Sequence, residues 1–597
     1  MVVPSFDRPT RLLVLIGFLQ GSLLFWMHKL LEWHAWPSTK PSVLITWYTL
    51  VFAVPLALQL MADHLVESRA WKFAAGLAGT LAVLSVYTAR TVFPGSGTSP
   101  DAFFESGAYF IPTVVLAWYV VLPFAQAWLK NKQARFPYPD LFQFSWNNIL
   151  VILTAGFYTS LFWGSLALWA SMFKIIHIDF FAELFTETWF IYLVTGGVFG
   201  FALANGRSQK GLVTNLRTTM LVMFRNLLPL PAFIALIFLA ALPFAGLQPL
   251  WDTNHATLLM LNLQLYVVFF LNAVYQDGRQ ETPPYPLPVR FLVEAGVIVL
   301  PVYSALSFYA LGLRVAQHGW SVSRVFAALA VFIMALYVTG YARSILRWES
   351  PWMKGAARIN VRIAAVVIAL AVLVNTPILD PRLITVRSQV ARLKSGAVSA
   401  EKFDYDYFRF LLGKPGRDAL VRLAKLEGHP QAETIRSKAA AALDKKNRWE
   451  NPATGVQTVE ELEKGMKLFP SGKVWDRSFL EFLLEGKEAY RHYWVGGRVL
   501  AVDLNKDSAE EYVLFKPYHH GQNLLFARTE TGWKEVGRLV SADSDFQDAN
   551  FEKQLSNCQV LLSQWNELRI GEQTYQVFPK SSDTTQPGPD IPMTSID

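Results

Sequence analysis

Residues 363–374 read IAAVVIALAVLV, an apolar run without charge that ends before Asn375 and Asp380. Five basic residues precede this run: Arg343, Arg347, Lys354, Arg358 and Arg362. An uncharged run with basic residues on one flank is typical of a membrane-spanning helix. We interpret it as the last span of the chain, because the sequence after it has ordinary soluble composition. The sequence therefore predicts a membrane domain before Asp380 and a water-soluble region after it.

The composition supports this division. The chain has 597 residues, of which 52% are hydrophobic and 17% are charged, and its mean hydropathy is +0.27. A soluble protein has roughly 25% charged residues. We attribute the net charge of +8 to basic loops at a membrane face, and expect no nucleic-acid partner. The single cysteine, Cys558, excludes an intrachain disulfide framework and a cysteine-rich zinc site.

Apolar segments of about 20 residues recur along the first two thirds of the chain. They predict an all-α polytopic transmembrane bundle of about eleven helices, followed by a soluble C-terminal α+β domain. We expect the first span to stay uncleaved, because Trp26, Met27 and His28 follow its apolar core where a signal peptide has small residues. The expected domains are a transmembrane domain (1–380), a juxtamembrane helical segment (381–450), a small α+β domain (451–580) and a disordered tail (581–597).

Basic residues in the loops predict the orientation. With a cytoplasmic N-terminus, eighteen lysines and arginines fall on the cytoplasmic side and six fall outside, namely Lys29, Lys40, Arg90, Lys174, Arg314 and Arg324. Loops that stay in the cytoplasm carry this excess of positive charge. An odd number of spans then places the C-terminal domain in the periplasm of a bacterium.

Small residues recur one helical turn apart in several spans. The patterns are Gly17-x-x-x-Gly21, Ala75-x-x-x-Gly79 and Gly196-x-x-x-Gly200-x-x-x-Ala204. Such spacing lets a second helix approach the bare backbone closely. Packing within one bundle is the interpretation we favour, and a dimerisation face is the alternative.

The tail begins with helical patterns at 381–393, 399–412, 417–425 and 430–445. Thr458 and Glu461 form a capping-box signature for a further short helix. From about residue 498 the hydrophobic period changes to two, which indicates a small antiparallel sheet. We expect its strands at 499–504, 512–515, 524–528, 533–539 and 575–578.

Four short motifs carry a resemblance to a known family. They are the turn His318-Gly319-Trp320-Ser321-Val322-Ser323, the run Arg387-Ser388-Gln389-Val390-Ala391-Arg392-Leu393, the run Phe403-Asp404-Tyr405-Asp406-Tyr407-Phe408, and the glycines Gly413 and Gly416. The chain resembles the bacterial inner-membrane proteins grouped as "domain of unknown function 4153". The resemblance implies an inner-membrane location and this architecture, and it implies no activity and no catalytic residue.

Polar residues within the spans are candidates for a functional site, because polar groups in hydrocarbon are costly. The eighth and ninth spans hold five of them: Asn262, Gln264, Asn272, Arg290 and Glu294. The structural alternative is that Arg290 and Glu294 pair at i, i+4 and that the amides join helices. Carboxylates and lysines are otherwise confined to span ends, which argues against an ion-coupled pump.

One loop of the tail has ligands suited to calcium. Asp503, Asn505, Asp507 and Glu511 supply oxygen atoms at alternating positions, as in calcium-binding loops. Ser508 stands where such loops have glycine, and Leu514 stands where they have glutamate. An acidic hairpin turn without metal is the alternative that we favour, and we expect no other cofactor. The pair His519-His520 has no further ligand at metal-binding spacing, so we interpret it as an exposed turn.

The sequence shows none of the common hydrolase or nucleotide-binding motifs. Our first hypothesis is therefore a non-enzymatic envelope scaffold or sensor, whose C-terminal domain binds an envelope protein while the bundle contacts the lipid bilayer. The alternative is a transporter or lipid-handling protein that uses the polar groups of the eighth and ninth spans. A membrane-embedded transferase is the third possibility. Its loop carboxylates would be Asp101, Glu105, Asp179 and Glu183.

Overall fold

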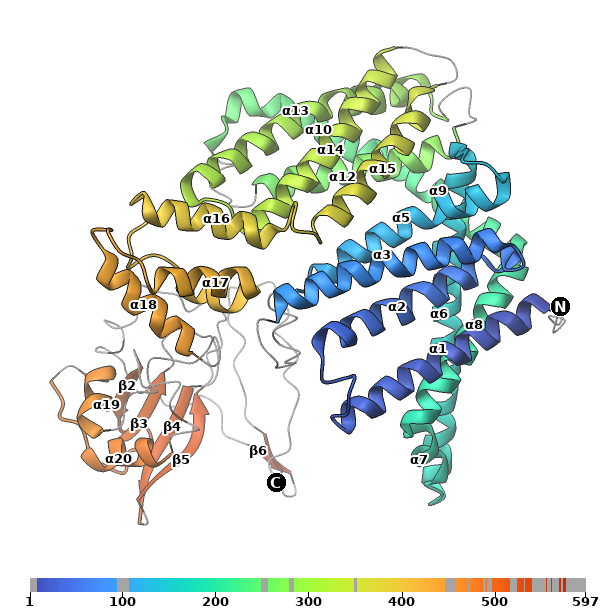
Figure 1. Cartoon of the computed structure of the whole chain (residues 1–597). Coiled ribbons are helices and arrows are strands. Elements are labelled where there is room, and N and C mark those ends of the chain that lie inside the picture. Colours follow the sequence, from blue (N-terminus) through green and yellow to red (C-terminus); the bar gives the residue numbers. More distant parts are fainter. Residues whose placement is uncertain are drawn as a thin grey trace. The chain divides into compact units, whose positions relative to one another are not determined.

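The computed structural model describes most of the chain, and every structural statement below concerns the described residues. These are 8–93, 107–248, 256–278, 284–347, 352–445, 458–470, 472–486, 490, 497–515, 523–530, 532–539, 555, 560, 568–570 and 573–575. The chain divides into two compact units, residues 1–444 and residues 445–597 (Figure 1). Each unit is described by itself.

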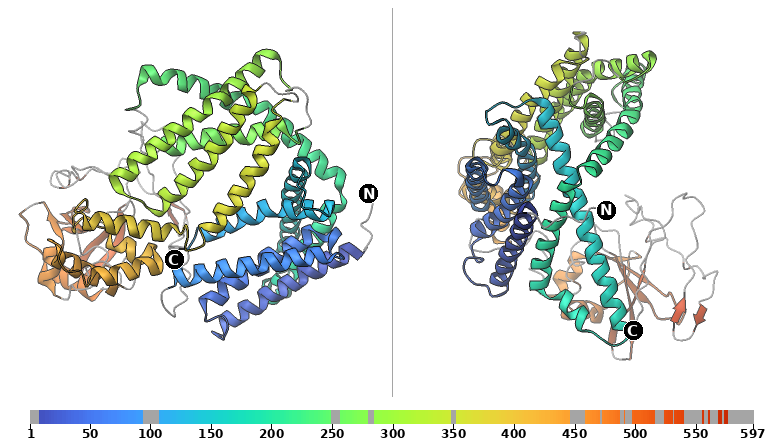
Figure 2. Two further views of the ribbon diagram at one scale, coloured as in Figure 1. Left: turned by 45° about the horizontal axis from the view of Figure 1, so that its top comes forward. Right: turned by 90° about the vertical axis from the view of Figure 1, so that its right-hand side faces the viewer.

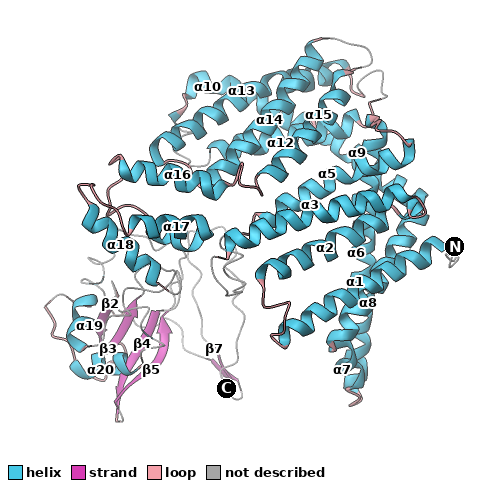
Figure 3. Ribbon diagram, viewed as in Figure 1, coloured by secondary structure: helices cyan, strands magenta, loops and turns pink. Residues whose placement is uncertain are grey.

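The first unit contains eleven helices that are long and apolar enough to cross a membrane, as the sequence predicts. In hydrocarbon a helix satisfies all its backbone hydrogen bonds internally, so uncharged apolar runs adopt this form (Figure 3). The helices of this type are α1 (Arg8–Glu32), α2 (Pro41–Leu60), α3 (Ser68–Val92), α5 (Phe110–Asn131), α6 (Tyr138–Ile175), α8 (Thr188–Ser208), α10 (Pro229–Ala245, continuous with the segment before it from Gly211), α12 (Ala256–Tyr275), α13 (Leu287–His318), α14 (Val322–Leu346) and α15 (Gly355–Leu373).

Three shorter helices connect these spans. A 3₁₀ turn, η1 (Ala62–His64), follows α2, and α7 (Phe180–Thr186) joins α6 to α8. The third, α9 (Lys210–Leu227), runs directly into α10 and packs against both α6 and α12. It is therefore held between two groups of helices by side chains from each.

The bundle has two lobes, each with its own hydrophobic core. We call α1, α2, α3, α5, α6 and α8 the early lobe and α10, α12, α13, α14 and α15 the late lobe. Figure 2 shows the blue helices of the early lobe beside the green and yellow helices of the late lobe. Besides α9, the packing of α5 on α15 joins them.

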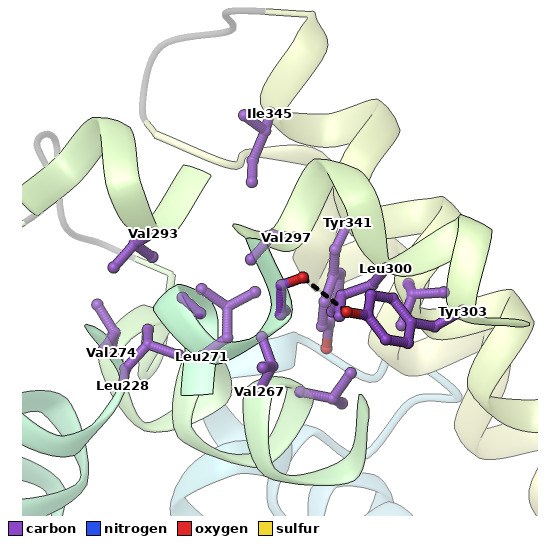
Figure 4. Close-up of a cluster of buried hydrophobic side chains, with 14 of the residues drawn as sticks. Leu228, Val267, Leu271, Val274, Val293, Val297, Leu300, Tyr303, Tyr341 and Ile345 are labelled. Atoms are coloured by element: carbon purple, nitrogen blue, oxygen red, sulfur yellow. Dashed lines mark hydrogen bonds between the residues drawn. The ribbon is translucent and has the colours of Figure 1, made fainter. Parts of the chain in front are cut away.

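The core of the late lobe consists mainly of aliphatic side chains, with three buried tyrosines, Tyr275, Tyr303 and Tyr341, and Trp352. Figure 4 shows Leu300 of α13 beside Tyr303 and Tyr341. The Tyr303 hydroxyl donates a hydrogen bond to the carbonyl oxygen of Ala235 over 2.6 Å, which satisfies the polar end of this buried ring. The Tyr303 ring is therefore buried without leaving its hydroxyl unpaired.

The early lobe is held together by a glycine crossing. Gly17 and Gly21 of α1 lie against Gly196 and Gly200 of α8, and a Cβ atom on Gly17 would stand 2.1 Å from the carbonyl oxygen of Gly196. The packing interpretation of these motifs is confirmed. The motif of the third span differs, because nothing lies within 4 Å of the Cβ position of Gly79.

Four helical segments follow the last span within the first unit. They are α16 (Pro381–Lys394), the π-helix η2 (Tyr407–Leu411), α17 (Gly413–Leu423) and α18 (Ala432–Asp444). The prediction of one helix over 399–412 is wrong for residues 399–404, which form turns, whereas residues 405–411 are helical. The Asp404 carboxylate accepts the Tyr407 N–H over 2.8 Å, and this local bond caps the first turn of the helix.

The second unit contains α19 (Val459–Gly465), α20 (Arg477–Glu485) and a five-stranded sheet in the order β1-β2-β3-β4-β5. The capping box of Thr458 and Glu461 is present as predicted. The aromatic ring of Phe479 packs against the rings of Tyr512, Phe526 and Trp533 at 4.9–5.3 Å between centroids. The strands are β1 (Lys467–Phe469), β2 (Arg498–Val502), β3 (Glu511–Phe515), β4 (Asn523–Thr529) and β5 (Gly532–Leu539).

The sheet is mixed, which corrects the antiparallel prediction. Strand β1 pairs with β2 in parallel, and the remaining neighbours are antiparallel. Three residues are too few to show a period of two, so β1 gives no signal in the sequence. A separate pair, β6 (Leu568–Ile570) and β7 (Gln573–Tyr575), does not belong to this sheet, and residues 576–578 of the last predicted strand lie outside the described part of the chain.

Candidate functional site

A cavity of about 860 Å³ lies between the two lobes of the bundle. Its lining is mostly apolar and aromatic, and the volume falls within the roughly 300–1,000 Å³ of small-molecule sites. Helices α5, α6 and α9 line one side, and α12, α14 and α15 line the other. The lining includes Leu116, Leu153, Met220, Phe224, Leu265, Phe269, Ile333 and Val367, with polar groups from Tyr138, Ser145, Asn262, Asn272, Tyr337 and Asn360.

A network of two amides and two phenols closes one end of the cavity. Asn360 donates to the Asn272 amide oxygen over 2.8 Å and to the Tyr138 hydroxyl over 2.9 Å. The Tyr341 hydroxyl bonds to both asparagines. These four residues come from α6, α12, α14 and α15. We call them the amide–phenol network. It ties both lobes together at one membrane face and presents polar groups to the cavity.

Asn262 places a further amide in the cavity. It lies ten residues before Asn272 on α12, which is about 15 Å along the helix axis. Its side chain is exposed and has no hydrogen-bond partner among the described residues. An unpaired amide in an apolar environment costs roughly 2–7 kcal/mol. Asn262 therefore offers the cavity an amide donor and acceptor that no described residue uses.

Gln264 does not belong to the cavity. It is fully buried, it donates to the carbonyl oxygen of Met260 over 3.0 Å, and it accepts from the Ser304 hydroxyl over 2.5 Å. These bonds join α12 to α13. Gln264 thus joins two helices, the structural alternative considered for the amides of this span.

Arg290 and Glu294 form a separate site outside the cavity lining. The Arg290 Nε atom lies 2.9 Å from Glu294 Oε1, and the Trp352 indole donates to the same oxygen over 2.9 Å. Glu294 is 5% exposed. The pair holds the segment around Trp352 against α13. The structure therefore brings together Asn262 and Asn272 from the predicted set and separates the other three.

The oxygen atoms of the predicted calcium loop are used within the loop. Asp503 accepts the N–H groups of Lys506 and Ser508, and Glu511 accepts the N–H of Leu504 over 2.7 Å. Hydrogen bonds from the Ala509 N–H and the Asn505 side chain lower the pKa of Asp507 from its ordinary value. Among the described residues no three His, Cys, Asp or Glu side chains are grouped for a metal ion. Calcium binding at this loop and the acidic turn without metal both stay predictions.

The remaining candidate residues are scattered. Asp179 is exposed, and Glu183 lies on the short helix α7. Neither carboxylate accepts a hydrogen bond from another described residue. Asp101, Glu105 and the pair His519-His520 lie outside the described part of the chain.

A buried ion pair at the opposite end of the bundle was not singled out in the sequence. Asp380 is 0% exposed and Arg382 is 2% exposed, and their side chains share two hydrogen bonds of 2.8 and 3.0 Å. The Tyr87 hydroxyl donates to Asp380 over 2.8 Å, and Arg382 donates to the Thr91 hydroxyl over 2.7 Å. The guanidinium also stands over the ring of Tyr109, 5.8 Å from its centroid. This cluster joins the start of α16 to α3 and α5.

Helix α16 also caps the end of α13. Gln389 donates to the carbonyl oxygens of His318 and Trp320 over 2.9 and 2.8 Å. The Arg392 guanidinium donates to the carbonyl oxygens of residues 316 and 317. A helix C-terminus has unsatisfied carbonyls and a partial negative charge, so these donors suit it.

The motifs behind the family resemblance therefore meet in space. The turn at 318–323 contacts the run 387–393 through these caps, and the Tyr407 hydroxyl accepts the Val322 N–H over 3.3 Å. Gly413 lies against the backbone of Thr91, where a Cβ atom would stand 2.4 Å from the carbonyl oxygen. The four motifs form the joint between the bundle and the helices that follow it.

A family model described as "Domain of unknown function (DUF4153)" matches residues 41–423. This region runs from α2 to α17, so it includes the cavity, the buried ion pair and the joint. No curated protein and no solved structure matches the chain. Since the match covers more than half of the 597 residues, this multi-pass membrane protein belongs to the family of domain of unknown function 4153.

Proposed function

We propose that the chain is a lipid-handling membrane protein, which holds one amphiphilic molecule in the cavity between its lobes. The observation that carries this proposal is the amide of Asn262, which has no partner among the described residues and lies in a mostly apolar wall about 15 Å from Asn272 along α12. An apolar chain would fill the space along α5, α6 and α12, and a polar group would bond to Asn262 or to the amide–phenol network. Two polar positions about 15 Å apart along α12 suit a headgroup that is taken up at one depth and moved to another.

Access from the bilayer supports the same proposal. Leu153 of α6 and Leu265 and Phe269 of α12 line the cavity, yet each has a large exposed fraction. Because these apolar side chains line the cavity and remain accessible, they form an open apolar wall along α6 and α12. A lipid therefore has an apolar route into the cavity, whereas a water-soluble solute would have to cross this apolar wall.

Replacing Leu153 with tryptophan should reduce the amount of lipid retained by the purified full-length protein by roughly tenfold, or about 1.4 kcal/mol. The indole would occupy the cavity, and Leu153 is 57% exposed, so the fold tolerates the change. The measurement is native mass spectrometry of protein extracted gently from its own membrane. Leu168→Trp is the control, because Leu168 lies on the same helix, is 63% exposed and is outside the cavity lining.

The variant Asn262→Leu refines this test. It should keep the stability of the fold, because the lost amide has no partner among the described side chains, and it should weaken retention by about 0.5–1.5 kcal/mol. If wild type, Leu153→Trp and Asn262→Leu retain equal amounts of lipid, the cavity does not hold the lipid. In that case the scaffold or sensor hypothesis, in which the C-terminal domain binds an envelope protein, would become the better one.

We further propose that this membrane is the bacterial inner membrane, with a cytoplasmic N-terminus and a periplasmic second unit. The excess of basic residues on one side and the odd number of span-type helices support this orientation. Green fluorescent protein fused after Lys446 should then stay dark, because it does not mature in the periplasm after unfolded export. Strong fluorescence of that fusion would reverse the orientation.

A further inference from the structure

A second hollow lies on the other face of α14. This groove of about 480 Å³ is formed by α13 and α14 and is distinct from the cavity between the lobes. Ala330, Ile333 and Tyr337 of α14 face the cavity, whereas Thr339, Ala342 and Leu346 of the same helix face the groove. The floor is therefore apolar, with Ile298 and Pro301 contributed by α13.

Two arginines stand at the end of this groove. Arg343 and Arg347 line it at the C-terminal end of α14. Arg343 is exposed, and its guanidinium has no ion-pair or hydrogen-bond partner among the described residues. An arginine presents five N–H donors in a planar fork that matches phosphate geometry. The groove thus has a cationic end beside the membrane face and an apolar floor that runs back along the span.

The simpler interpretation is that these arginines only anchor α14 at the membrane face and interact with its dipole. It accounts for the charge, but it does not account for the hollow beneath it. Arg358 and Arg362 of α15 are also exposed near the same membrane face, and they line neither this groove nor the cavity between the lobes. The chain therefore offers a comparison between arginines that line this groove and arginines that do not.

We infer that this groove binds one anionic phospholipid. The phosphate contacts Arg343 at the end of the groove, and one acyl chain lies over Ile298, Pro301 and Leu346. Basic pockets between membrane helices are suited to anionic headgroups, because attraction to the phosphate adds to the burial of the chain. This site does not depend on the proposed function of the cavity, since it lies on the opposite face of α14.

The test compares two lipids on the purified full-length protein. Dioleoyl phosphatidylglycerol and dioleoyl phosphatidylcholine are added separately in detergent, and binding is measured by native mass spectrometry and by the shift in thermal unfolding temperature. Wild type should bind phosphatidylglycerol in preference. Arg343→Gln should weaken that binding by roughly fivefold, the effect of about 1 kcal/mol for one arginine near a charged headgroup.

Three comparisons decide the outcome. Arg358→Gln removes the same charge outside the groove and should bind phosphatidylglycerol like wild type. Thr339→Trp keeps both arginines and fills the groove from an exposed position, so it should also lose binding. If Arg343→Gln and Arg358→Gln weaken phosphatidylglycerol binding equally, the net charge of the protein explains the binding and the groove does not. A shift of the same size with inorganic phosphate would show an anion site without a lipid, and either result overturns the inference.

Discussion

Replacing Asp380 with asparagine should destabilise the first unit by about 3–5 kcal/mol. The carboxylate accepts bonds from the Tyr87 hydroxyl and from the backbone and guanidinium of Arg382. Asparagine has no charge, so Arg382 would remain as a buried and uncompensated cation. Removing one partner of a buried ion pair costs this much, because the desolvated charge is no longer neutralised. We expect α16 to separate from α3 and α5 before the spans themselves unfold.

The measurement is thermal unfolding of the purified protein in detergent, with hydrogen exchange of α16 as a local reading. Asp63→Asn is the matched control. Asp63 also pairs with an arginine, Arg207, at 2.6 Å, but it is 74% exposed, and an exposed pair contributes about 0–1 kcal/mol. The double variant Asp380→Asn, Arg382→Met should recover much of the loss, because no buried charge is left. If Asp380→Asn unfolds like Asp63→Asn, the pair does not hold the joint.

The number and position of the spans could be predicted from the sequence, because each depends on a local apolar run. The last span shows the limit of this signal. Its helix runs over Gly355–Leu373, whereas the uncharged apolar run in the sequence covers residues 363–374. Arg358 and Arg362 are charged but lie in the helix, and Thr376 and Pro377 belong to the turn that leads to Asp380. A membrane boundary and a helix boundary are different properties, and hydropathy reports the first.

The candidate site was predicted in part. Asn262 and Asn272 were identified because amides are conspicuous in an apolar run. Gln264 was grouped with them, although two residues correspond to about 200° around a helix and place it on the opposite face from Asn262. That signal was present in the sequence. The contribution of Tyr138 and Asn360 was not, because it depends on the meeting of α6 and α15, whose residues are more than 200 positions apart.

The buried ion pair was missed for a related reason. Asp380 before Pro381 is a normal helix start, and Asp380 does cap Arg382 as such a residue would. Nothing local shows that both side chains are buried. Their partners, Tyr87 and Thr91, stand about 290 positions earlier, at the end of the third span. The sequence shows that a helix begins here, and only the packing of the bundle shows that a charge pair joins it to the spans.

Replacing Gly196 with leucine should destabilise the first unit by a comparable amount, at least about 3 kcal/mol. A Cβ atom there would stand 2.2 Å from the carbonyl oxygen of Gly17, which is backbone and cannot rotate away. Helices α1 and α8 would have to separate along the whole crossing, losing the close backbone contact on which association of apolar helices depends. We expect loss of the folded population in detergent, measured by thermal unfolding and by protease sensitivity of α1.

Gly79→Leu supplies the control for this prediction. Gly79 belongs to the same kind of motif, in a span of similar length, but nothing lies within 4 Å of its Cβ position. Leucine there should leave the stability unchanged or should raise it by up to about 1 kcal/mol, because glycine is a poor helix former. The two variants share the chemistry of the change and differ in what the new side chain meets. If both unfold the protein, Gly79 also contacts another helix, and the most direct candidate is a second copy of the chain.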